Sequence, residues 1–317
     1  MKTTKWLITY AAFGAAVAFF LYSCEETPTE EPAWEPLGFL GLWGSEGVGD
    51  GEFLAPTGVA VAPDGTVYVA DFSRHDVQYF TAQGSFLGRW GTFGDGDGEF
   101  EHPWGLAVAN DGTVYVADSH NHRIQYFTAS GSFLGKWGKA GGGDGQFDTP
   151  TGIAVAPNGS VYVVEAGETG RVQYFTSTGS FLAKWTGPEG GGKLVGATYL
   201  AFAPGGSVVY VADAGNDRIQ FFTAAGVPLG RWGVEGPGPG EFRRPGGVAA
   251  APEGRVYVTD IANDRLQVFS PKGDFLGKWG GRGTNDRQFY GPGGIAAARD
   301  GTIYVVDRGN DRVVYYR

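Results

Sequence analysis

The sequence predicts an all-β fold, a six-bladed β-propeller built of four-stranded antiparallel blades. The first observation behind this prediction is a unit of 47 or 48 residues that occurs six times. Four-stranded units of this length, repeated radially, favour a propeller, because solenoid repeats are mostly shorter or helical. The unit is marked by Trp43, Trp90, Trp137, Trp185, Trp232 and Trp279, and by Asp71, Asp118, Glu165, Asp213, Asp260 and Asp307.

Turn residues divide each unit into four short strands, which is the second observation. In the second unit we expect strands at 105–109, 113–117, 123–127 and 133–137. The Asn-Asp-Gly turn at 110–112 supplies the positive φ that a tight hairpin needs. The first strand is small and apolar, as expected where six strands crowd around an axis.

The two ends of the repeat region complement each other, which is the third observation. Residues 39–43 read as a fourth strand that lacks the first three, whereas 315–317 follow the third strand of the sixth unit. Pairing them closes the ring and removes an unpaired edge, which would be an aggregation hazard. We therefore expect 39–317 to form one closed, monomeric propeller.

The composition fits a folded β protein and narrows its function. Gly supplies 56 of the 317 residues, yet aromatic residues make up 15% and apolar residues 42%, too many for a disordered Gly-rich chain. The formal net charge of −10 argues against nucleic-acid binding, which needs clusters of Lys and Arg. The single cysteine excludes an internal disulfide.

The first 23 residues are predicted to be a lipoprotein signal peptide. Lys2 and Lys5 precede a long apolar run, and a small residue, Ser23, precedes Cys24. This stretch resembles the bacterial lipobox, which implies that Cys24 becomes a lipid-modified N-terminus held by acyl chains alone. An uncleaved signal anchor and a fully secreted chain with a spare thiol are the alternatives.

The residues after the predicted cleavage point indicate an exported, tethered domain. Residues 24–38 are acidic and Pro-rich, which is typical of an extended tether. Glu25 resembles the residue found after the cysteine in lipoproteins sent to an outer membrane, if the host has one. We therefore expect a lipid-anchored, extracytoplasmic protein at the cell envelope.

The best copy of the unit, residues 103–127, contains Pro-Trp-Gly, then Asp-Gly-Thr-Val-Tyr-Val-Ala-Asp, then Asn-His-Arg-Ile-Gln-Tyr-Phe. It closely resembles the NHL repeat, and the resemblance extends over 39–317. For fold, the resemblance implies a six-bladed propeller. For function it implies several classes: noncatalytic extracellular sensor and binding domains, RNA-binding domains of larger proteins, and metal-dependent lyases.

Residues repeated in every unit are interpreted as structural, because a residue that every blade carries serves every blade. We expect the acid that ends each second strand to bond to backbone or to an arginine, and the tryptophans to pack between blades. The Gly-Asp-Gly-x-Phe stretches at 49–53 and 96–100 read as turns, since no phosphate-loop Lys follows. The arginines that start third strands are Arg123, Arg171, Arg218, Arg265 and Arg312.

Function is therefore sought where the units differ, on what we call the top face. This face is formed by the loops from each fourth strand to the next blade and by the loops between second and third strands. Nine acids and Lys139 occupy loops 44–57, 91–103 and 138–150. Four acids and five bases occupy loops 186–198, 233–246 and 280–293. This asymmetry suits a cationic ligand or a hard metal ion.

The candidate binding residues lie in the acidic half. All four histidines, His75, His102, His120 and His122, are in its loops, and His102 is close to Trp104. A histidine cluster can hold a transition-metal ion. Chance placement of four histidines is the alternative.

Two further candidates are less regular. Asp95, Asp97 and Glu99 present carboxylates that suit Ca²⁺, with simple solvated loops as the alternative. Tyr199 stands where the other units have the Gly of Pro-x-Gly, and its side chain is expected to reach the channel mouth, where propellers usually bind ligands. Drift in a tolerant blade is the alternative.

The sequence favours a noncatalytic module that presents its top face to a protein, peptide or glycan. It contains neither a Gly-x-Ser-x-Gly elbow nor a His-Glu-x-x-His pair. The alternative is a metal-dependent lyase or lactonase with one ion at the channel mouth, near His102, His120, Asp97 and Tyr199. Nucleic acid is not an expected partner, and no cofactor beyond such an ion is implied.

Overall fold

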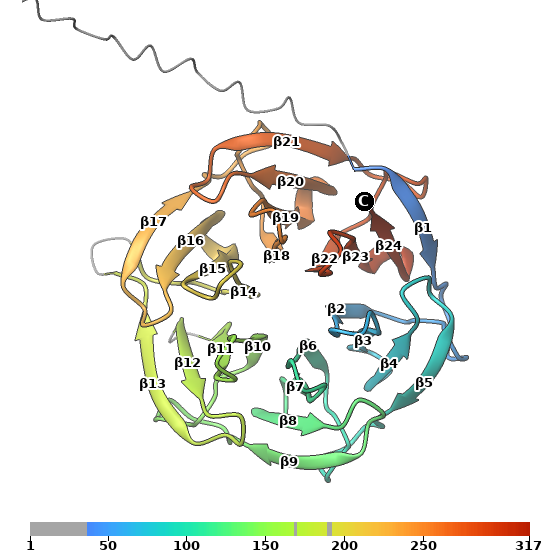
Figure 1. The fold of residues 1–317 in the computed structure, drawn as a ribbon, viewed down its shortest axis with the longest axis vertical. Coiled ribbons are helices and arrows are strands. Elements are labelled where there is room, and N and C mark those ends of the chain that lie inside the picture. Colours follow the sequence, from blue (N-terminus) through green and yellow to red (C-terminus); the bar gives the residue numbers. More distant parts are fainter. Residues whose placement is uncertain (1–36, 168–169, 189–191) are drawn as a thin grey trace, which may run out of the picture. The chain divides into compact units, whose positions relative to one another are not determined.

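A computed structural model describes residues 37–167, 170–188 and 192–317. In these residues six four-stranded antiparallel sheets stand around a central axis, as the blades of a propeller (Figure 1). The predicted fold class is confirmed. The predicted signal peptide (1–23), Cys24 and all but the last two residues of the predicted tether lie outside the described residues.

In blades 1 to 5 the strands follow the chain outward from the axis, whereas blade 6 takes its outermost strand from the N-terminal end of the propeller. Blade 1 contains β2 (Pro56–Val61), β3 (Val67–Asp71), β4 (Asp76–Phe80) and β5 (Phe86–Trp90). Blade 2 contains β6 (Pro103–Val108), β7 (Val114–Asp118), β8 (Arg123–Phe127) and β9 (Phe133–Trp137). Blade 3 contains β10 (Pro150–Val155), β11 (Val161–Glu165), β12 (Arg171–Phe175) and β13 (Phe181–Thr186).

The remaining blades follow the same order. Blade 4 contains β14 (Leu200–Phe202), β15 (Val208–Asp213), β16 (Arg218–Thr223) and β17 (Pro228–Trp232). Blade 5 contains β18 (Pro245–Ala250), β19 (Val256–Asp260), β20 (Arg265–Phe269) and β21 (Phe275–Gly280). Blade 6 contains β22 (Pro292–Ala297), β23 (Ile303–Asp307), β24 (Arg312–Tyr316) and β1 (Phe39–Trp43). Short 3-10 turns follow three second strands: η1 (Ala214–Asn216), η2 (Ile261–Asn263) and η3 (Arg308–Asn310).

The predicted strands of blade 2 agree with the structure within two residues. β6 starts at Pro103 rather than at residue 105, because Pro103 pairs with Asp118 across a bulge. The third and fourth strands have the predicted bounds. The sequence did not predict the 3-10 turns, which are single turns within loops.

Ring closure occurs as predicted. β1 pairs antiparallel with β24, with Phe39 opposite Tyr316 and Trp43 opposite Val313. Gly38 and Arg317 extend the pairing through two backbone hydrogen bonds of 2.8 and 2.9 Å. The two strands lie side by side, blue against red, in Figure 1. The last blade is therefore built from both ends of the propeller.

Tryptophan packs each blade against the next, as predicted. Trp90 at the end of blade 1 lies 5.5 Å from Phe127 of blade 2, between ring centroids. Trp43 has the same relation to Phe80, at 5.6 Å. A Cβ on Gly131 would come within 2.6 Å of the Trp90 ring, so this hairpin turn, which faces the tryptophan, needs a glycine. The core is thus shared between neighbouring blades.

The repeated acid and arginine tie the top-face loops, also as predicted. In blade 5, Arg265 Nε donates to Asp260 Oδ2 at 2.7 Å, and Asp260 Oδ1 accepts the Arg243 amide at 2.8 Å. The same guanidinium donates to the carbonyls of Pro237, Gly238 and Glu241. Equivalent ion pairs within the described residues join Arg123 to Asp118, Arg171 to Glu165, Arg218 to Asp213 and Arg312 to Asp307.

No helix in the described part of the chain is long and apolar enough to cross a membrane.

Candidate functional site

Five aromatic and histidine side chains gather on the top face where blades 1 and 2 meet. The rings of Phe72 and His102 stack with their centroids 4.0 Å apart. His102 lies 4.7 Å from His75 and 4.5 Å from His120. The edge of Trp104 meets Phe72 at 5.6 Å. We call these five residues the mouth cluster, and four of them are candidates that the sequence predicted.

Backbone hydrogen bonds orient the histidines of the mouth cluster. His75 and His102 have left-handed backbones, with φ of 59° and 55°. The His102 amide donates to His75 Nδ1 at 3.1 Å, and His102 Nδ1 donates to the Phe72 carbonyl at 3.0 Å. Burial, and then the neighbouring His102, lower the pKa of His75. Burial, followed by His102, likewise lowers the pKa of His120, so the surroundings favour the neutral form of both rings.

His122 lies apart from the mouth cluster. Its Nδ1 accepts the Thr149 amide at 3.4 Å, at the boundary of blades 2 and 3. The equivalent residues Asp217 and Asp264 accept the equivalent amides of the next blades, each at 2.7 Å. His122 therefore makes the same hydrogen bond between neighbouring blades as Asp217 and Asp264, although the sequence analysis placed it among the binding candidates.

Two residues that the sequence analysis did not select complete the site. Arg308 of blade 6 places its guanidinium carbon 5.4 Å from the Trp104 ring centroid and 5.7 Å from that of Phe72. Phe93 meets His75 at 5.0 Å and is 66% exposed. Both were detectable as departures from the repeat. Glu46, Ala140, Glu235 and Arg282 take the place of Phe93 in other units, and Ser119, Ala166, Ala214 and Ile261 take the place of Arg308.

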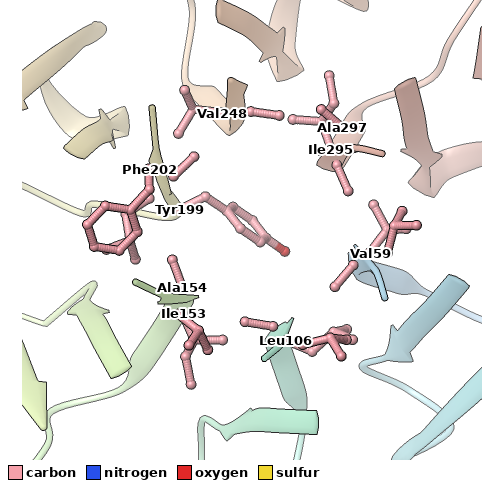
Figure 2. A pocket seen from close by; sticks show the side chains of 18 of the residues that line it. Val59, Leu106, Ile153, Ala154, Tyr199, Phe202, Val248, Ile295 and Ala297 are labelled. Carbon is pink, nitrogen blue, oxygen red and sulfur yellow. The ribbon is translucent and has the colours of Figure 1, made fainter. Parts of the chain in front are cut away.

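Tyr199 crosses the central channel below the mouth cluster. It starts from blade 4, and its hydroxyl donates to the Thr57 carbonyl of blade 1 at 2.9 Å. Figure 2 shows its ring among first-strand side chains such as Val59 and Val248, with the oxygen directed across the channel. Burial raises its pKa above the ordinary tyrosine value. Tyr199 thus reaches the channel, as expected from the sequence.

The tyrosine separates two spaces along the axis. Below it, mostly apolar side chains of the first strands line a cavity of about 240 Å³. Above it, Tyr199, Trp104 and Arg308 line a recess of about 40 Å³ at the channel mouth. The mouth is therefore a shallow site with an aromatic wall, and its floor is closed by Tyr199.

The predicted calcium ligands are not brought together. Asp97 pairs with Lys136 at 2.7 Å, and Glu99 Oε2 accepts the Gly96 amide at 2.9 Å. The Asp95 backbone carbonyl accepts a hydrogen bond from Arg123. Over 37–167, 170–188 and 192–317, no three His, Cys, Asp or Glu side chains are arranged to hold a metal ion. The three histidines of the mouth cluster likewise do not form such a group.

The acidic half of the top face is partly neutralised by neighbouring strands. Lys136, which pairs with Asp97, comes from a fourth strand that the count of loop charges omitted. Arg89 lies 3.5 Å from Asp50 in the same way, and Lys184 lies 2.6 Å from Asp144. These pairs are exposed and screened by solvent. Among the described residues no ion pair is formed by five of the nine loop acids, Glu46, Glu52, Asp95, Glu99 and Glu101.

The fold and the mouth cluster define a β-propeller with a top-face site. The family model for the NHL repeat matches residues 53–80, 100–127, 242–269 and 289–316, so the chain contains NHL repeats. The matches fall on blades 1, 2, 5 and 6. A search of curated proteins by sequence found no match.

Solved structures show the same fold at low sequence identity. A Bacteroides thetaiotaomicron protein of unknown function has a TM-score of 0.68 and 16% identity, over 86% of this chain and 74% of that chain. A Xanthomonas campestris gluconolactonase has a TM-score of 0.63 and 14% identity, over 84% and 87% of the two chains. Catalytically inactive virginiamycin B lyase from Staphylococcus aureus, with quinupristin, has a TM-score of 0.59 and 16% identity, over 83% of this chain and 84% of that chain. At such identities the similarity shows the fold alone.

Proposed function

We propose that this protein is a noncatalytic binding module, lipid-anchored through Cys24 outside the cytoplasm, whose top face binds a protein, peptide or glycan at the cell envelope. The observation that supports this function is the mouth cluster with Arg308. Its rings are not needed by the repeat, because other units carry small residues at the position of Trp104: Thr57, Thr151, Thr198, Gly246 and Gly293.

The chemistry of the mouth cluster suits recognition rather than turnover. Partly exposed aromatic faces bury area on a sugar ring or an apolar side chain at a low cost in conformational entropy. Arg308 adds hydrogen-bond donors beside those faces, and it forms no ion pair with another described residue. The metal-dependent lyase or lactonase is not proposed, since no described residues form the ligand group that such chemistry would use at the mouth.

The test is a binding screen of the purified full chain against a glycan array and a peptide library. We expect saturable ligands whose affinity falls by about tenfold or more in Trp104→Ala, as for an aromatic residue at the centre of an interface. Leu134→Ala, which removes an exposed apolar side chain from the outer strand of blade 2, should bind like the wild type.

Two results would contradict this function. Ligands that bind Trp104→Ala as tightly as the wild type would show that the mouth cluster is not the site. Conversion of a bound ligand to product in the presence of a divalent metal would show catalysis.

The lipid anchor is tested in a separate experiment. Radiolabelled palmitate should be incorporated into the chain in bacterial cells and should not be incorporated into the Cys24→Ala variant.

A further inference from the structure

Arg308 carries a guanidinium group that the repeat does not use. It follows the acid that ends the second strand of blade 6, and the arginine that pairs with this acid, Asp307, is Arg312. Arg308 is therefore free of the structural task that the repeated arginines perform. The other units have Phe72, Ser119, Ala166, Ala214 and Ile261 at its position.

The N–H groups of Arg308 are available to a ligand. Its guanidinium carbon lies 5.4 Å from the Trp104 ring centroid and 5.7 Å from that of Phe72, and such cation–π contacts require no hydrogen bond. Among the described residues the guanidinium has no hydrogen-bond or ion-pair partner. Arg308 is partly exposed, and its nitrogens are not among the buried side-chain atoms that lack a partner, so these donors are open to solvent.

The recess at the channel mouth gives a small anion room beside these donors. Its volume is about 40 Å³, enough for roughly three water-sized groups, which is as many heavy atoms as a carboxylate has. Arg308 is the one charged side chain among the described residues that line it. The other hydroxyl-bearing side chains of the lining already donate to carbonyls; they are Thr57, Thr198 and Tyr199. An anion in the recess therefore meets Arg308 and no opposing carboxylate.

Aromatic surface adjoins the recess. Trp104 lines it, the edge of Trp104 meets Phe72, and Phe93 on the far side of His75 is 66% exposed. A guanidinium and a carboxylate form two parallel hydrogen bonds, which orient the group that bears the carboxylate. An apolar side chain on the neighbouring carbon would then pack on these rings. The mouth thus suits a carboxylate with an apolar group directly beside it.

Acidic groups lie close to Arg308 outside the recess. Burial, followed by Glu46, Asp71 and Asp307, raises the pKa of Asp311 to about 6, whereas Arg308 lowers it without forming an ion pair. Burial lowers the pKa of His75, and Glu101 opposes this, which puts the charge of Glu101 beside the mouth cluster. A ligand that carries negative charge alone is therefore disfavoured around the mouth.

The unpaired loop acids favour positive charge further along the ligand. Five of them form no ion pair with a described residue, and they belong to the loops that precede blades 1 and 2; they are Glu46, Glu52, Asp95, Glu99 and Glu101. A ligand with one terminal carboxylate and cations behind it matches both the recess and these loops. A basic peptide segment at the end of a protein chain has this pattern, whereas an acidic glycan has no cation.

We propose that the recess at the channel mouth binds the C-terminal carboxylate of a protein chain whose preceding residues are basic. Arg308 donates to the carboxylate, the last side chain packs on Trp104 and Phe93, and upstream lysines or arginines lie over the acidic loops. This inference rests on the proposed function, and it narrows the ligand from a protein, peptide or glycan to a basic C-terminal segment.

The test uses the full chain and an N-acetylated peptide, Lys-Ser-Lys-Ser-Gly-Phe with a free carboxylate, as the probe in calorimetric titration. We expect saturable binding. The same peptide with a C-terminal amide should bind about tenfold or more weakly, because the charge-assisted bonds to Arg308 are lost. Replacing both lysines of the peptide by glutamate should also weaken binding, and added salt should reduce the difference.

Two variants of the protein separate the recess from general electrostatics. Arg308→Ala introduces the residue that two other units carry, so its melting temperature should equal that of the wild type. It should bind the probe about tenfold or more weakly and should no longer distinguish the free carboxylate from the amide. Arg287→Ala removes the same charge from an exposed position in the loop before blade 6 and should bind like the wild type.

Four results would overturn the proposal. They are equal binding of the free and amidated peptides, unchanged binding by Arg308→Ala, no saturable binding by the wild type, and a uronic acid glycan that binds more tightly than the probe and requires Arg308. The proposed function fails on a different result, which is that ligands of the top face bind Trp104→Ala as well as the wild type. A probe that requires Trp104 but not Arg308 would sustain the function and reject this inference.

Discussion

Blades 1 and 5 each use a guanidinium group to hold the equivalent top-face loop, but the arginine that supplies it stands at a different position in the two blades. In blade 5 the guanidinium comes from the start of the third strand, where it also neutralises Asp260. In blade 1 it comes from Arg74 in the preceding loop, and the strand position becomes Asp76. The comparison teaches that the repeat fixes where a guanidinium must lie but not which residue provides it.

The largest expected effect is in blade 5. Arg265→Ala removes the partner of a fully buried carboxylate, which should lower the free energy of unfolding by about 3–5 kcal/mol. Urea denaturation followed by tryptophan fluorescence measures it. Lys278→Ala, on an exposed position of the next strand, should change little. A small effect of Arg265→Ala would mean that the carbonyl contacts alone hold the loop.

The next effect is a reversal in blade 1. Asp76→Arg alone places two guanidinium groups at one loop and should destabilise the protein, whereas adding Arg74→Asn should restore stability. We expect a coupling free energy of about 1–3 kcal/mol between the two changes, as found for residues in direct contact. The four unfolding curves of the double-mutant cycle measure it. Additive effects would break the equivalence between Arg74 and the regular arginines.

A smaller effect is expected for Asp76→Asn. The change weakens the pairing with Arg74 but also removes a charge that burial disfavours, so the free energy of unfolding should move by less than about 1 kcal/mol. The same denaturation assay compares it with Asp260→Asn, which disturbs a fully bonded carboxylate and should cost more. If both changes lower the free energy of unfolding equally, the Asp76 oxygen that lacks a hydrogen-bond partner among the described residues has no measurable effect on stability.

The smallest effect concerns the hydrogen bond that joins the top-face loops of neighbouring blades. His75 in blade 1 and Asp264 in blade 5 accept equivalent amides, but only histidine titrates near neutral pH. Because the pKa of His75 is lowered in the fold, the unfolded chain takes up its proton first, and stability falls as pH drops below about 6.5. His75→Asp should flatten the melting temperature between pH 7 and pH 5. An unchanged slope would assign that dependence to other groups.

The sequence predicts the fold almost completely because the residues that pack and tie the blades recur in nearly every unit. Tryptophan and the Asp–Arg pair recur at a fixed interval, and each sits in the same contact in the structure. The offset ends correctly predict the pairing of β1 with β24. The start of β6 differs from the prediction by two residues, since a bulge between Pro103 and Leu106 extends the pairing.

The site is predicted only in part because it joins distant units. His75, His102, His120 and Trp104 were visible as unusual residues, but Arg308 approaches them only because blade 6 lies beside blade 1 after closure. The charge of the loops was overestimated, since bases such as Lys136 reach them from strands. The sequence analysis did not select Asp76, although it stands where the other units have arginine, and its contact with Arg74 is seen only in the structure.

Closure by the two ends also dictates an order of assembly. β1 is synthesised before any other part of the propeller, yet its partner β24 is the last strand to be made. Contacts between such distant segments form late, because a long loop must first be closed. Until then the backbone edge of β1 has no strand to pair with. The first strand of the propeller therefore stays without its partner until the last strand has been made.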